Sequence, residues 1–129
     1  MSGKSLAGCR VMVVEDEFLV AMLLENILQD EGVIIVGPFG RVLPAIEAAE
    51  RAELDLAVLD VNVAGEKIHP VAEALSRRGV PFLLLSGYGA AAAPDHPDWP
   101  VCSKPFDRKA LLKRLSLLLA PIAGLGSFW

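Results

Sequence analysis

The chain has 129 residues, a formal net charge of −4 and 53% apolar residues. This length fits a single domain over residues 1–129, and we expect its core to span about residues 9–120. Without a basic cluster, the sequence argues against nucleic acid as a direct partner. No run approaches the roughly 18 apolar residues of a membrane helix, and no apolar signal core precedes the first strand, so we expect a cytoplasmic protein that does not bind membranes.

Short apolar runs and helical patterns alternate along the chain. The runs predict strands at residues 10–14, 33–36, 54–60, 80–85 and 101–103. Apolar residues at helical spacing predict helices at residues 18–31, 41–52 and 68–78, and a last helix from residue 108 to about residue 120. Strands that alternate with helices through short links require right-handed crossovers. The pattern therefore predicts an α/β fold, with a doubly wound five-stranded parallel sheet and helices on both faces.

Two segments depart from this alternation. Residues 90–100 contain three prolines within seven residues, so we expect a shortened or disordered fourth helix there. Residues 121–129 form an apolar, glycine-rich C-terminal tail that could cover a face of the domain or a partner, including a second copy in a homodimer. Cys9 and Cys102 have no metal-ligand spacing and are expected to be free, buried thiols.

Polar residues stand at the ends of four predicted strands: Glu15 and Asp16, then Asp60, then Ser86, then Lys104. The carboxyl ends of parallel strands form the ligand crevice of such a sheet, so we expect one site. Three neighbouring carboxylates repel one another unless a cation is present, and oxygen ligands without His or Cys favour Mg²⁺. Lys104 and Ser86 would then face a phosphoryl group, with Asp60 as its nucleophile.

These motifs, in this order, resemble the receiver domain of two-component response regulators over about residues 10–119. The resemblance implies the flavodoxin-like strand order 2-1-3-4-5 and transfer of a phosphoryl group from a histidine kinase to Asp60. We expect a single-domain response regulator that signals by binding a downstream protein, or that drains phosphoryl groups from a shared kinase. Beyond Mg²⁺-dependent self-phosphorylation and autodephosphorylation, we expect no enzyme activity. Residues 81–89 also resemble the stand-alone receiver subclass called FATGUY, whose hallmark is Thr-Gly-Tyr at the fourth strand end.

The resemblance also implies how the metal is bound. Asp16 and Asp60 would bind Mg²⁺ directly, and Asn62 would contribute its backbone carbonyl. Glu15 would act mainly through a metal-bound water. No other cofactor is expected.

The remaining roles concern the binding of the phosphoryl group and the change of conformation that follows phosphorylation, the switch. Ser86 and Lys104 would bind phosphoryl oxygens, and Lys104–Pro105 would be a cis peptide. Ser86 replaces the threonine of the subclass. Val101 stands where most receivers have a switch aromatic, three residues before the lysine, so Tyr88 is the candidate substitute beside the Ser86 hinge.

Three other functions compete with this one. A nucleotide enzyme would need glycines after the first strand, where this chain has a Glu-Asp-Glu run. A haloacid-dehalogenase-like phosphatase carries its nucleophile after the first strand with an acid two residues on, where this chain has Asn62 after Asp60. A pseudo-receiver that binds partners without phosphorylation stays the alternative because of Val101. His69 and His96 lack ligand spacing and are expected to be surface or loop residues. Trp99 and Trp129 are expected to be packing anchors.

Overall fold

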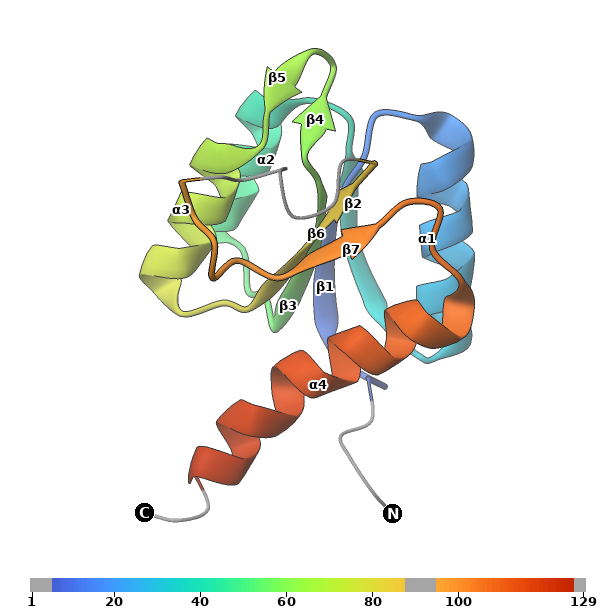
Figure 1. Ribbon diagram of the computed structural model, residues 1–129, viewed down its shortest axis with the longest axis vertical. Helices are drawn as coiled ribbons and strands as arrows, with labels where there is room; N and C mark the ends of the chain where they lie inside the picture. The colour runs from blue at the N-terminus through green and yellow to red at the C-terminus, as the bar shows by residue number, and fades with distance from the viewer. Residues whose placement is uncertain (1–5, 88–94, 127–129) are drawn as a thin grey trace.

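The computed structural model describes residues 6–87 and 95–126. In these ranges five strands form one parallel sheet with the order β2-β1-β3-β6-β7 (Figure 1). Its strands are β1 (Arg10–Val14), β2 (Ile34–Phe39), β3 (Leu56–Asp60), β6 (Phe82–Ser86) and β7 (Val101–Ser103). The helices are α1 (Phe18–Asp30), α2 (Val42–Arg51), α3 (His69–Arg78) and α4 (Arg108–Gly126). Counted along the chain, the strand order is the expected 2-1-3-4-5, so the predicted fold class is confirmed.

Helices cover both faces of the sheet. Successive strand residues point to opposite faces, and on β1 Met12 and Val14 join the core cluster of α2 and α3. Val11 and Val13 join the cluster of α1 and α4. Figure 1 shows the same two layers, with α2 and α3 on one side and α1 and α4 on the other. This double cover explains why every residue of β3 is buried and why the strand is an unbroken apolar run up to its last residue.

Two predicted boundaries were wrong. We expected the second strand to end at residue 36, but β2 continues through a cis Gly37–Pro38 peptide to Phe39. β2 lies at the edge of the sheet, where a residue without a backbone N–H is tolerated. We also expected the last helix to end at about residue 120, but α4 continues to Gly126. Pro121 removes one backbone donor, which here does not end the helix.

A small hairpin follows β3, and the sequence pattern did not predict it. Its strands are β4 (Asn62–Val63) and β5 (Glu66–Lys67), paired antiparallel. The connecting Ala64 and Gly65 have φ values of 52° and 82°, the positive pair of a type I′ turn. Val63 is fully buried in the cluster of α2 and α3, so the hairpin is anchored to the core.

The described part of the crossover between β6 and β7, Gly87 and residues 95–100, contains turns and no helix. This agrees with a shortened fourth helix, while residues 88–94, including Tyr88, lie outside the described residues. Trp99 meets Phe82 edge-on at 5.4 Å between ring centroids and stacks on His96 at 3.7 Å. The predicted role of Trp99 as a packing anchor is therefore confirmed, while Trp129 lies outside the described residues.

Two further expectations concern the thiols and membranes. Within the described residues, neither Cys9 nor Cys102 forms a disulfide; Cys102 is buried as expected, whereas Cys9 is only half-buried. Within the described ranges, no helix combines the length and apolar character needed to cross a membrane.

Candidate functional site

A pocket of about 280 Å³ opens at the carboxyl end of the sheet. β3 ends at Asp60, β6 ends at Ser86, and Lys104 follows β7, so three neighbouring strands deliver these residues to one place. Of the residues predicted to bind the metal or the phosphoryl group, all but Glu15 line this pocket, and Glu15 is a buried residue whose Oε1 lies 3.3 Å from the Nζ of Lys104. The lining consists of Asp16, Glu17, Asp60, Val61, Asn62, Gly65, Ser86, Gly87 and Lys104.

Three carboxylates gather at this pocket. Glu15, Asp16 and Asp60 each offer an oxygen, and these oxygens all lie within 4.8 Å of one another. Glu15 and Asp60 are buried, with 3% and 7% of their surface exposed, whereas Asp16 is exposed. Carboxylate oxygens with water access are the ligands that Mg²⁺ prefers, so the donor set fits the predicted ion.

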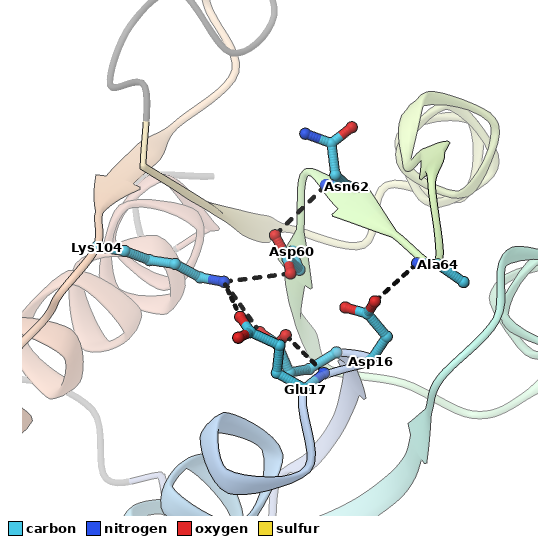
Figure 2. Close-up of polar contacts among 7 residues, drawn as sticks. Asp16, Glu17, Asp60, Asn62, Ala64 and Lys104 are labelled. Carbon is cyan, nitrogen blue, oxygen red and sulfur yellow. Dashed lines mark hydrogen bonds and ion pairs between the residues drawn. The ribbon is translucent and has the colours of Figure 1, made fainter.

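Lys104 is the cation that faces these acids (Figure 2). Its Nζ lies 3.2 Å from Oδ2 of Asp60, 3.3 Å from Oε1 of Glu15 and 3.8 Å from Oε1 of Glu17. The backbone N–H of Lys104 donates to the carbonyl of Ser86 at 2.9 Å, which ties the ends of β6 and β7 together. The Lys104–Pro105 peptide is cis, as the resemblance implied. The ammonium of Lys104 thus neutralises part of the negative charge of the acids around it.

Burial and charge perturb two groups of the site. Burial, and then the hydrogen bond and charge of neighbouring Asp60, raise the pKa of Glu15 from 4.5 to about 7. The backbone N–H of Glu17 and the ammonium of Lys104 oppose this shift without cancelling it. Burial lowers the pKa of Lys104, but Asp60 and Glu15 outweigh that effect and hold it above its ordinary value. Lys104 is therefore charged at neutral pH, while Glu15 is partly protonated there.

The hairpin after β3 contacts two of the acids. The backbone N–H of Asn62 points to Oδ1 of Asp60 at 3.4 Å, while its side chain is directed away from Asp60 (Figure 2). The metal-binding role expected of the Asn62 backbone carbonyl stays a prediction. The N–H of Ala64 donates to Oδ2 of Asp16 at 2.9 Å. Among the residues with polar contacts in the site, the sequence reasoning missed Ala64 and Glu17, although Glu17 stood in the acidic run after the first strand.

The switch candidates occupy different surroundings. Ser86 is 2% exposed and pairs with Ser103 at the end of the sheet. Val101 is half-buried in β7 and packs against the α2–α3 core cluster together with Trp99. Tyr88 lies outside the described residues, so its switch role stays a prediction.

Comparisons with known proteins agree with this geometry. The family model described as the response regulator receiver domain matches residues 11–116. The transcriptional regulatory protein PdtaR of Mycobacterium tuberculosis is 31% identical over 116 residues, which cover 86% of this chain and 57% of PdtaR. The chain spans about half the length of the curated relatives it matches.

Solved structures extend the comparison. The solution structure of SdrG from Sphingomonas melonis Fr1 is 38% identical, with a TM-score of 0.77 over 91% of this chain and 99% of SdrG. The receiver domain of the histidine kinase PA1611 from Pseudomonas aeruginosa PAO1, crystallised with magnesium in its active-site cleft, shares the fold at 21% identity and a TM-score of 0.72, over 88% of this chain and 98% of that domain. The family match covers most of the chain, and the chain therefore belongs to the response regulator receiver domain family.

Proposed function

We propose that this receiver accepts a phosphoryl group from a histidine kinase on Asp60. It then signals by binding a downstream protein, or it drains phosphoryl groups from a shared kinase. The observation that carries the proposal is the setting of Asp60, a 7% exposed carboxylate at the end of β3 that lines the pocket 3.2 Å from the Lys104 ammonium. A buried acid beside a cation in a pocket is typical of a reacting group rather than of packing.

The proposed reaction uses groups that the pocket brings together. An oxygen of Asp60 attacks phosphorus, the phosphorus–nitrogen bond to the kinase histidine breaks, and the histidine ring leaves. Lys104 would bind a phosphoryl oxygen, since its ammonium reaches Asp60 and is charged at neutral pH. Ser86, at the end of the neighbouring strand, would bind another with its hydroxyl.

The acids would hold the Mg²⁺ of this reaction. Glu15, Asp16 and Asp60 supply carboxylate oxygens, and Asn62 would add its backbone carbonyl. When bound, the ion neutralises the acids and the phosphoryl oxygens. We propose that Lys104 then turns from Glu15 toward the phosphoryl group on Asp60, because its Nζ is within 3.3 Å of Glu15 and 3.2 Å of Asp60.

The phosphodonor would dock on the start of α1. Phe18 and Leu19 are 74% and 76% exposed, and Met22 and Leu23 on the same helix are also exposed. Glu17, which directly precedes them, lines the pocket. Large apolar side chains exposed next to a reaction site favour protein docking at that place.

We further propose that the chain acts as a single-domain regulator of the FATGUY type, supported by Ser86-Gly87-Tyr88 at the end of β6. Apart from phosphorylation and dephosphorylation of Asp60, it would have no enzyme activity. The alternative is a pseudo-receiver that binds partners without phosphorylation. Val101, half-buried in β7 at the position of the usual switch aromatic, favours that alternative.

Intact-protein mass spectrometry after incubation with acetyl phosphate tests the proposal. With Mg²⁺, the wild type should gain about 80 Da, the mass of one phosphoryl group. Without Mg²⁺ it should gain nothing. Asp60→Asn should gain nothing in either condition, whereas Asp98→Asn, which alters an exposed acid of the crossover, should behave as wild type. A wild type that forms no adduct with Mg²⁺ would leave the pseudo-receiver as the function.

A further inference from the structure

We propose that the β4–β5 hairpin is a positioning element for the carboxylate of Asp16. The inference rests on the proposed function, because it concerns how the chain prepares its Mg²⁺ site. The residue that acts is Ala64, through its backbone N–H. It lies in the turn of the hairpin between β3 and α3, a segment in which the sequence analysis gave a role to Asn62 but not to Ala64.

The contact joins two distant parts of the chain. The N–H of Ala64 donates to Oδ2 of Asp16 at 2.9 Å, although 48 residues separate the two (Figure 2). Glu15 and Asp60 are buried, so the surrounding core restricts their side chains. Asp16 is exposed and follows β1 outside regular structure, so packing restricts it far less. The Ala64 N–H therefore supplies the orientation that burial supplies to the other two acids.

The donor itself is held rigidly. Asn62 pairs with Lys67, and Val63 pairs with Glu66, which closes the hairpin around its two-residue turn. The N–H of Ile68 donates to the carbonyl of Val61 at 2.9 Å and closes the base. Val63 and Ile68 are fully buried, so the core fixes the position of the turn. Ala64 holds a φ of 52°, which alanine seldom adopts, and this aims its N–H at Asp16.

The chemistry of a carboxylate indicates whether the Ala64 hydrogen bond strengthens or weakens Mg²⁺ binding by Asp16. The Ala64 N–H uses Oδ2, and the other oxygen of Asp16 remains available to a cation. Metal-binding carboxylates are commonly hydrogen-bonded in this way, and the second hydrogen bond orients the ligand. The hairpin should therefore strengthen Mg²⁺ binding rather than compete with it.

Two substitutions at one position separate the donor from the side chain. Ala64→Pro removes the N–H and cannot adopt the positive φ, whereas Ala64→Gly keeps the N–H and adopts it readily. In a Mg²⁺ titration followed by amide NMR shifts, Ala64→Pro should raise the Kd about tenfold. Ala64→Gly should keep the wild-type Kd. A folded Ala64→Pro protein with the wild-type Kd would overturn the inference.

Amide hydrogen exchange tests the contact without any metal. In Asp16→Ala, protection of the Ala64 N–H should fall about tenfold, since its acceptor is gone. Protection of the Ile68 N–H, which bonds to Val61, should not change. Equal protection of Ala64 in both proteins would overturn the inference even if Ala64→Pro does not fold. A wild type that binds no Mg²⁺ would instead refute the proposed function, and the exchange result would still stand by itself.

Discussion

Lys104 reaches over two strands to contact Glu15. Its Nζ lies 3.3 Å from Oε1 of a glutamate whose side chain is fully buried, although β3 and β6 separate β1 from β7 in the sheet. The ammonium passes Asp60 on the way, 3.2 Å from Oδ2. Within the described residues, the ammonium of Lys104 thus faces the three acids Glu15, Asp16 and Asp60, and protons or a metal ion must supply the remaining positive charge. The stability of the protein should therefore depend on pH and on Mg²⁺.

Without Mg²⁺, the Glu15 contribution to the free energy of unfolding should fall as the pH rises from about 4.5 to about 7. Burial and Asp60 raise the pKa of Glu15 in the folded state, so the folded protein binds more protons than the unfolded chain in this window. The loss is at most about 3 kcal/mol and is complete above the folded-state pKa. Urea unfolding at about pH 5, 6 and 7.5 measures it.

Glu15→Gln is the matched variant for this pH effect, because it keeps the shape of the side chain and removes the titrating group. Its free energy of unfolding should vary less with pH than that of the wild type. Saturating Mg²⁺ should also reduce the wild-type slope, since the ion favours the ionised acids. If Glu15→Gln retains the full wild-type slope, another group holds the proton.

Lys104→Met should destabilise the Mg²⁺-free protein by about 2 kcal/mol. The substitution removes the ammonium and leaves the buried carboxylates of Glu15 and Asp60 facing each other without compensation. Mg²⁺ should restore much of this stability, because it supplies the missing charge. Lys109→Met, which alters an exposed lysine of α4, is the control and should change stability little. Equal losses in both variants would show that the Lys104 contacts contribute nothing specific.

The buried sheet was predictable from the sequence for a physical reason. Strands covered on both faces are continuous apolar runs, so β3 and the polar residue that ends it were visible as a pattern. The parallel arrangement then required Asp60, Ser86 and Lys104 to meet at one edge. Their shared pocket in the structure agrees with that inference, while their chemical roles stay predictions.

The remaining features depend on geometry that no periodic pattern carries. The hairpin strands are two residues each, too short for any periodicity. The contact of Ala64 with Asp16 is made by a backbone N–H, so no side chain marks it in the sequence. The end of β2 depends on its edge position, which the order of elements along the chain does not reveal by itself.

Trp99→Ala should lower the free energy of unfolding by about 3 kcal/mol. Trp99 packs against Phe82 and stacks on His96, and these contacts attach the crossover to the core next to α3. His96→Ala removes the stacked ring and its 3.7 Å contact with Glu73, and it should cost about 1 kcal/mol. Chemical denaturation of both variants measures the difference. Equal effects would mean that the stack, rather than burial of the indole, anchors the crossover.

Leu19→Ser should slow phosphoryl transfer from the cognate histidine kinase about tenfold, the cost of one central apolar contact in an interface. Leu43→Ser is the matched control, because Leu19 and Leu43 are 76% and 77% exposed on α1 and α2 respectively. Phosphorylation by acetyl phosphate should be unchanged in both variants, since a small donor needs the pocket and no docking face. If both serine variants slow transfer equally, the kinase does not distinguish the start of α1 from α2. If Leu19→Ser also slows the reaction with acetyl phosphate, Leu19 acts on the pocket, and the docking face must lie elsewhere.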